Sequence, residues 1–155
     1  MKSPNIFNVN TRGFTLIEIL VVLGILAVIA GSGLAFTLDS YRGYLFRSEY
    51  TTVTHMLAKA RSRAINNFNE SAHGLKILGD QYVLFVGGDY ATSDSDLQEI
   101  FPRNTALSVA GEDEIVFEQL TGNANDCDSP SCTITFGYGA SVKNITINAQ
   151  GGIIW

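Results

Sequence analysis

The apolar and polar positions divide this chain into three parts, and the first is a long apolar run. Residues 14–38 are almost all apolar, and residues 19–38 contain no charge and no proline. At about 1.5 Å per residue such a run forms a helix of roughly 30 Å, the thickness of a bilayer's hydrocarbon core. The pattern therefore predicts a helix over residues 14–38 that can span a membrane.

In the second part, residues 39–73, apolar positions recur every three or four residues. The positions that share one helical face are Val53, Met56, Leu57, Ala60, Ala64 and Phe68. This spacing is typical of an amphipathic helix that packs on a domain. We therefore expect one continuous helix from about residue 14 to about residue 68, with residues 39–73 as its amphipathic continuation.

The third part, residues 74–155, has a period of two. It predicts short strands at residues 75–78, 81–86, 106–110, 115–120, 132–136, 142–148 and 152–155. Gly79-Asp80 between the first two is a hairpin signal, with positive φ available at the glycine. Short strands without helices between them favour an antiparallel sheet or a pair of sheets. The expected fold class is α+β, a long N-terminal helix packed on an antiparallel β domain.

Glu18 is the one ionisable side chain of the apolar run. An ionised carboxylate inside an apolar membrane segment costs about 2.5 to 3.5 kcal/mol on insertion scales and should have a partner. A short polar leader, residues 1–13, precedes the run and ends in Gly13. Cleavage after Gly13 would give Phe14 a new α-amine, which is largely protonated at neutral pH. Glu18 would then be the fifth residue of the mature chain.

The sequence Gly13-Phe14-Thr15-Leu16-Ile17-Glu18 resembles the processing motif of type IV prepilins and type II secretion pseudopilins. The resemblance implies cleavage between Gly13 and Phe14 by a prepilin peptidase, N-methylation of Phe14, and packing of the apolar helices in a filament. It also implies a partner for Glu18, the Phe14 amine of a neighbouring subunit, and so a role for Glu18 in assembly and register. Two other interpretations stay open: a conventional secretory signal cleaved before Gly31, and an uncleaved anchor.

Residues 60–64 and 145–151 resemble minor pilins of the FimT and FimU kind and H-type pseudopilins of type II secretion. The resemblance implies a structural subunit, inserted as a single-pass protein in the cytoplasmic (inner) membrane with its C-terminal domain outside the cytoplasm. A filament assembly platform would then move it into a type IV pilus with other pilin subunits. The alternatives are an H-type pseudopilin, or an adhesive or ligand-binding module anchored by a pilin stem.

Charge argues against a nucleic-acid partner. The net charge is −5 and the sequence pI is about 4.8, whereas nucleic-acid-binding domains are generally basic. Some members of the resembling group bind DNA through arginines near the C-terminus, but Lys143 is the last basic residue here. The chain also lacks a nucleophile elbow and a phosphate loop, so we expect no enzyme and no cofactor.

Cys127 and Cys132 are separated by four residues and lie in the part that would face outside the cytoplasm, where disulfides form. We expect a disulfide between them, and the alternative is two free thiols. A zinc site would need further ligands, and His55 and His73 lie on or just after the helix, so no metal site is expected.

Residues 79–130 contain eleven acidic side chains and one basic side chain, Arg103. We expect a solvated acidic loop, and the alternative is a calcium site, although the spacing does not fit an EF-hand. Lys59, Arg61 and Arg63 form a basic cluster, either solvated or complementary to the acidic surface of a neighbouring subunit. Gly31-Ser32-Gly33 is a weak point of the helix, with local melting on assembly and a straight helix as the two alternatives.

Overall fold

The computed structural model describes residues 13–124, 127 and 131–155, with the side chains of residues 33–40 and 42 outside the description. The chain divides into two compact units, Met1–Arg42 and Gly43–Trp155. We call the second the globular unit, and the described residues 13–32 of the first the stem. One helix, α1 (Leu16–Ile65), contributes residues to both units.

The helix α1 is close to the predicted range but ends earlier. Its start is capped by Thr15, whose hydroxyl oxygen accepts a hydrogen bond from the backbone N–H of Glu18 at 3.3 Å. After Ile65 the chain leaves the helix, and Asn67 has a positive φ of 55°. Helical periodicity therefore stops before Phe68, whose side chain is 52% exposed. The prediction that Phe68 lies on the buried helical face is wrong for this reason.

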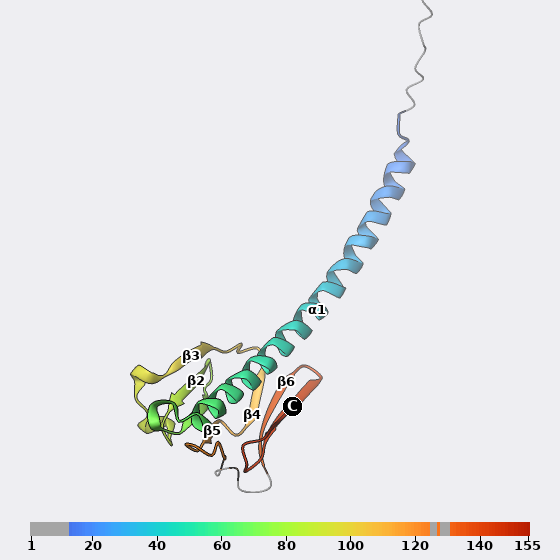
Figure 1. Cartoon of the computed structure of the whole chain (residues 1–155). Coiled ribbons are helices and arrows are strands. Elements are labelled where there is room, and N and C mark those ends of the chain that lie inside the picture. Colours follow the sequence, from blue (N-terminus) through green and yellow to red (C-terminus); the bar gives the residue numbers. More distant parts are fainter. Residues whose placement is uncertain (1–12, 125–126, 128–130) are drawn as a thin grey trace, which may run out of the picture. The chain divides into compact units, whose positions relative to one another are not determined.

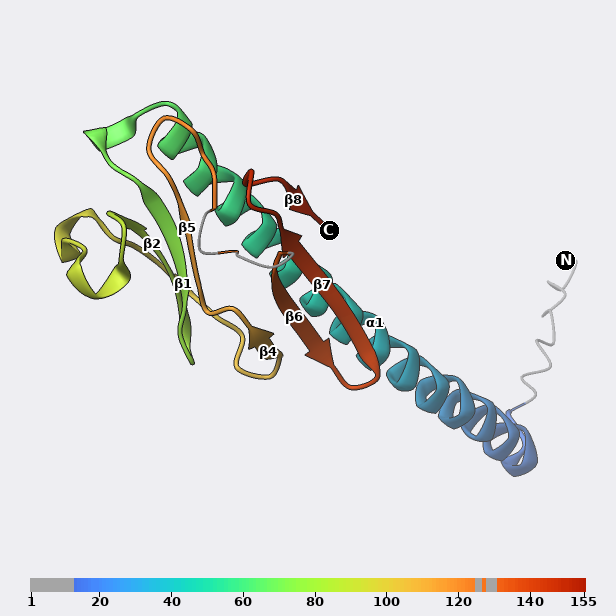
Figure 2. The same ribbon diagram turned by 90° about the horizontal axis from the view of Figure 1, so that it is seen from below.

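The globular unit contains two four-stranded antiparallel sheets (Figures 1 and 2). The first sheet has the strand order β3 (Glu99–Pro102), β2 (Gln81–Val86), β1 (His73–Ile77) and β5 (Glu114–Phe117). The second has the order β4 (Ser108–Gly111), β6 (Cys132–Tyr138), β7 (Ser141–Ile147) and β8 (Ile153–Ile154). Among its described residues the unit also has the short 3-10 helices η1 (Phe68–Glu70), η2 (Tyr90–Thr92) and η3 (Ser95–Leu97). The α+β prediction is confirmed.

One face of α1 and the inner faces of both sheets form a single hydrophobic core. Strand β6 shows the alternation that this requires, because Cys132, Ile134 and Phe136 are buried while the residues between them are only partly buried. The helix contributes a stripe that begins earlier than the sequence pattern suggested: Phe46, Tyr50, Val53, Met56, Leu57, Ala60 and Ala64. The same core fixes the helix against strands from both sheets.

The first hairpin forms at the predicted place. Strands β1 and β2 pair in antiparallel register, and the Leu78 N–H donates to the Gln81 carbonyl at 2.8 Å across Gly79-Asp80. Gly79 does not have a positive φ, so the turn does not use the backbone conformation that glycine makes available. Arg103 secures this turn, since its guanidinium donates to the Leu78 carbonyl at 2.9 Å.

The chain crosses from one sheet to the other at Gly111. Strand β4 belongs to the second sheet and β5 to the first, with only Glu112 and Asp113 between them. Gly111 has a φ of 99°, and a Cβ atom there would lie 2.0 Å from the Thr133 carbonyl oxygen. Glycine is therefore required where β4 ends. The sequence pattern predicted neither this crossing nor strand β3.

Candidate functional site

The stem exposes apolar side chains around its whole circumference. Its large hydrophobic residues are between 50% and 81% exposed: Phe14, Leu16, Ile17, Ile19, Leu20, Val21, Val22, Leu23, Ile25, Leu26, Val28 and Ile29. A helix that is apolar on all sides is stable only when it is buried, in a large core or in a membrane. The stem therefore requires a partner surface that the described residues do not provide.

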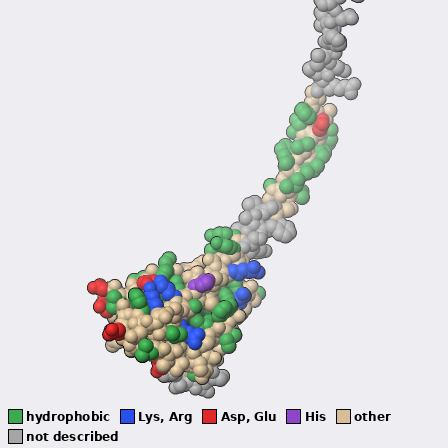
Figure 3. Space-filling view, viewed as in Figure 1, with side chains coloured by type: hydrophobic (Ala, Val, Ile, Leu, Met, Phe, Trp, Pro, Cys, Tyr) green, Lys and Arg blue, Asp and Glu red, His purple; other side chains and the backbone are tan. Residues whose placement is uncertain are grey.

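Figure 3 shows these hydrophobic side chains as a nearly continuous apolar surface along the described stem. Apolar patches larger than a few hundred Å² on a soluble surface mark sites of protein or membrane contact. Within the described residues, no helix combines the length and the hydropathy that a bilayer span requires. The predicted apolar run continues through residues 33–38, whose side chains lie outside the description.

Glu18 lies in the first turn of α1, where two local interactions favour a carboxylate. Thr15 and Glu18 have the spacing of a capping box, and the Thr15 half of that box is formed. A negative charge is also favoured by the helix dipole near the N-terminus. The side chain is exposed, and within the described residues it makes no ion pair. The carboxylate oxygens are therefore available to a second group.

The predicted cleavage site is accessible. Gly13 and Phe14 precede α1, and Phe14 is 81% exposed. Among the described residues, and apart from its chain neighbours, no atom lies within 4 Å of a Cβ built on Gly13. Phe14 and Glu18 line the same shallow hollow of about 240 Å³, together with Ile19, Val22 and Leu23. Residues 1–12 of the predicted leader lie outside the described residues.

The predicted weak point of the helix, residues 31–33, is helical in the structure. α1 continues through Gly31-Ser32-Gly33, and the Ser32 hydroxyl donates to the Val28 carbonyl at 2.8 Å. Such a bond to the preceding turn satisfies the hydroxyl and slightly weakens or bends a helix. Local melting on assembly stays a prediction.

The two cysteines form the predicted disulfide. The sulfur atoms of Cys127 and Cys132 are bonded, and both residues are buried in the hydrophobic core. Cys132 is the first residue of strand β6, so the bond joins Cys127 to the start of that strand. The remaining loop residues 125–126 and 128–130 lie outside the described residues.

Two acidic residues of the predicted acidic loop cap short helices. Asp89 caps η2 by accepting the Ala91 N–H at 2.6 Å, and Asp94 caps η3 by accepting the Asp96 N–H at 3.0 Å. Within the described residues, no group of three or more His, Cys, Asp or Glu side chains is arranged to hold a metal ion.

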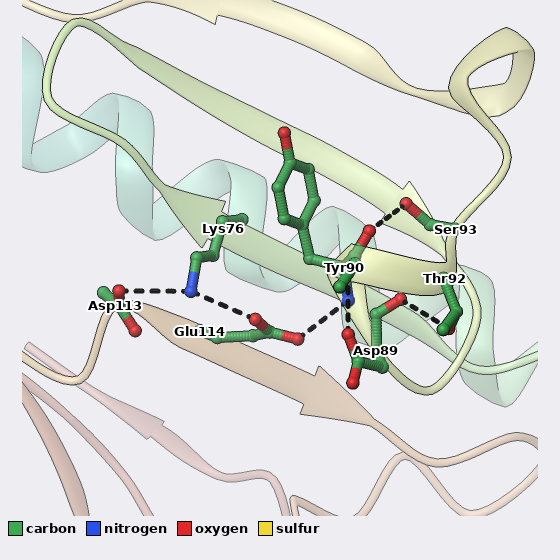
Figure 4. Close-up of polar contacts among 8 residues, drawn as sticks. Lys76, Asp89, Tyr90, Thr92, Ser93, Asp113 and Glu114 are labelled. Atoms are coloured by element: carbon green, nitrogen blue, oxygen red, sulfur yellow. Dashed lines mark hydrogen bonds and ion pairs between the residues drawn. The ribbon is translucent and has the colours of Figure 1, made fainter.

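A second acidic group surrounds Lys76 (Figure 4). The Lys76 ammonium lies 3.1 Å from a carboxylate oxygen of Asp113 and 3.1 Å from one of Glu114. Glu114 also accepts the Tyr90 N–H at 2.9 Å. Burial lowers the pKa of Lys76, but the hydrogen bonds and the negative charges of Asp113 and Glu114 together raise that pKa overall. This group joins strands β1 and β5 to the start of η2, which is a structural role.

The basic cluster on α1 is used within the chain. Glu99 on strand β3 pairs with both Lys59 and Arg63, with 2.6 Å between the Lys59 nitrogen and a carboxylate oxygen. Hydrogen bonds from Lys59 and then Arg63 lower the pKa of Glu99. Arg61 donates to the carbonyl oxygens of Gly122 and Gln150. The cluster is therefore neither simply solvated nor free to complement a neighbouring subunit.

Comparison with known families identifies one match. A family model described as the prokaryotic N-terminal methylation motif, the type IV pilin signal, matches residues 8–34. Those residues include Gly13, Phe14 and Glu18. No curated protein and no solved structure matches the chain. The chain is therefore type IV pilin-like at its N-terminus, which indicates a structural subunit rather than an enzyme and implies a prepilin peptidase and other pilin subunits as partners.

Proposed function

We propose that this chain is a minor subunit of a type IV pilus, cleaved between Gly13 and Phe14 and N-methylated at Phe14. The observation that carries the proposal is the exposed apolar stem, which begins immediately after the cleavage position. Packed against the stems of other subunits, these side chains would lose their contact with water. Burial of apolar surface contributes about 25 cal/mol per Å² and supplies the cohesion of such a filament.

Before assembly, the apolar run over residues 14–38 is held in the cytoplasmic membrane as a single span, and the globular unit lies outside the cytoplasm. The Cys127–Cys132 disulfide supports this placement, because disulfides persist in oxidising compartments. The assembly platform then transfers the stem from lipid to the apolar centre of the filament. The lipid tails and the filament centre are both apolar, so each keeps the side chains of the stem out of water.

Glu18 sets the register of the stems in this proposal. Its partner is the methylated amine of Phe14 in a neighbouring subunit. The support is the exposure of the carboxylate and its lack of an ion pair within the described residues. An ion pair in an apolar surrounding is weak evidence for stability but a recognised means of fixing register.

Substitution of Glu18 tests this role. Glu18→Gln keeps the size of the side chain and removes its charge, and Glu18→Ala removes both. We expect both variants to be cleaved and methylated normally and to enter filaments poorly, measured as the ratio of filament-bound to membrane-bound protein. Glu112→Gln is the matched control, because Glu112 is exposed and makes no ion pair within the described residues. Normal incorporation of Glu18→Gln would contradict the register role.

An H-type pseudopilin would have the same processed stem, and it is the second candidate among pilin-like subunits. The two are distinguished by deleting the pilus and the type II secretion assembly platforms separately in the host. Loss of incorporation with the pilus platform alone supports the pilus assignment, and loss with the secretion platform alone assigns the chain to the pseudopilus.

A further inference from the structure

With residues 14–38 in the bilayer, as proposed above, the start of the globular unit lies close to the membrane surface in every orientation of the two units. The apolar run ends at residue 38 and Tyr44 follows six residues later. Even a fully extended chain covers at most about 3.6 Å per residue, so Tyr44 lies within roughly 22 Å of the end of the run. As a helix the same residues cover only about 9 Å.

The turn between β6 and β7 lies at this same end of the globular unit. Tyr50 donates to the carbonyl of Asn144 in β7 at 3.1 Å, and further along α1 Arg61 donates at 3.0 Å to the carbonyl of Gln150, which follows the end of β7. Strand β7 therefore runs in the same direction as α1 (Figure 2). Residues 139–140, which precede β7, consequently lie toward Gly43.

Two cations and two exposed apolar side chains occupy this end, and we call them the rim: Tyr44, Arg47, Val142 and Lys143. The Lys143 ammonium lies 4.7 Å from the centre of the Tyr50 ring, and Arg47 is exposed one helical turn before Tyr50. Tyr44 is 68% exposed and Val142 is 63% exposed. Tyrosine is enriched at both membrane–water interfaces, where its ring lies at the level of the headgroups.

The rim is positive although the chain carries a net charge of −5. Glu49 is the described acid nearest to it in sequence, and its carboxylate accepts the Asn104 N–H at 3.0 Å. In the short connection, Asp39 and Arg42 cancel in formal charge. On the face shown in Figure 3, most acidic side chains lie toward one edge of the globular unit, with one basic cluster beside them and other basic side chains farther away. The two cations of the rim suit an anionic partner.

We propose that the rim binds the anionic surface of the membrane while the chain is an unassembled precursor. The inference rests on the proposed function, which places residues 14–38 in the bilayer. Lys143 and Arg47 would lie among lipid phosphates, with Tyr44 and Val142 at the level of the headgroups. The contact restricts the orientation of the globular unit before the stem leaves the membrane.

The test uses the full chain in vesicles of phosphatidylcholine, with and without phosphatidylglycerol. A nitroxide at Ala140→Cys, in the exposed turn before β7, reports collisions with a nickel chelate anchored at the lipid headgroups. Each Lys or Arg beside an anionic leaflet shifts such an equilibrium roughly fivefold. We expect more frequent collisions with phosphatidylglycerol, a roughly fivefold shift toward the free state for Lys143→Gln, and a larger one when Arg47→Gln is added.

Lys59→Gln is the matched control, because Lys59 is an exposed lysine whose partner Glu99 keeps its pair with Arg63. It should leave the collisions unchanged. Equal collisions in both kinds of vesicle, or an equal effect of Lys59→Gln and Lys143→Gln, would overturn the inference. A second nitroxide at Leu26→Cys reports whether the stem is inserted in the bilayer. If the stem is inserted but the collisions of the label at position 140 do not depend on phosphatidylglycerol, only the rim contact is rejected. If the stem stays in water, the proposed function is rejected as well.

Discussion

The two halves of α1 use the same kinds of apolar side chain with opposite results. In the stem, Leu26 is 55% exposed, whereas in the globular unit Leu57 is fully buried. The difference lies in the pattern, because residues after 45 place their apolar side chains on one face and the stem places them on all faces. A one-sided stripe is covered by two sheets of the same chain. The stem, which is apolar on all sides, is not covered by any of the described residues.

The two halves of α1 should therefore serve different purposes, one the stability of the globular unit and the other assembly. The globular unit has its own core and its own disulfide, so its stability depends on residues within residues 43–155. The stem contributes nothing to that core among the described residues. Substitutions in the two halves of one helix should therefore affect different measurements.

The largest effect should come from truncating the same residue type in each half. Leu57→Ala leaves a cavity in the core and should lower the free energy of unfolding of the globular unit by about 2 to 5 kcal/mol. Leu26→Ala should leave that value unchanged and reduce filament incorporation instead. Chemical denaturation in detergent, followed through the single tryptophan, Trp155, measures the first quantity. Equal destabilisation by the two substitutions would contradict the separation.

A smaller loss is expected from removing the disulfide. The loop closed by Cys127 and Cys132 is short, so the chain-entropy account assigns the bond about 2 kcal/mol. Cys127→Ser combined with Cys132→Ser should lower the unfolding free energy by this amount, without affecting cleavage at Gly13. Unfolding of the unaltered chain under reducing conditions is the control and should give the same loss.

The smallest effect concerns Glu99, which joins strand β3 to α1. Because hydrogen bonds from Lys59 and Arg63 lower the pKa of Glu99 in the folded chain, its contribution is present at neutral pH. The contribution disappears as the pH falls through this lowered pKa. Glu99→Gln should therefore cost less than about 1 kcal/mol at pH 7, since the pairs are partly exposed, and nothing in strong acid.

Thermal unfolding of Glu99→Gln across this pH range provides the measurement, with Glu112→Gln as the control acid. A deficit of Glu99→Gln that persists unchanged in acid would show that the ion pairs are not its source.

The sequence predicted what depends on local periodicity and missed what depends on long-range pairing. The helix, the first hairpin and most strands follow from spacings of three to four and of two. Phe68 was misplaced because Asn67 ends the helical periodicity before it. The sequence does not predict strand β3, because Glu99-Ile100-Phe101-Pro102 does not alternate between polar and apolar residues and the strand forms by pairing with β2. The crossing at Gly111 likewise requires knowledge of Thr133, a residue distant in sequence.

The candidate site can be proposed from the sequence more readily than the fold because it is local. Gly13, Phe14 and Glu18 lie within six consecutive residues, and their pattern needs no tertiary structure to be identified. The roles of the charged residues were not predictable in the same way. Glu99 is 36 residues from Arg63 and 40 from Lys59, and only the fold brings them together.

The central claim is that the mature chain begins at Phe14, and the N-terminus of the protein recovered from its own host tests it most directly. Intact-mass measurement and N-terminal peptide analysis should show a chain of residues 14–155 whose Phe14 amine is methylated. A chain that begins at Met1 or at Gly31 would leave Glu18 without its partner amine and would contradict the filament function.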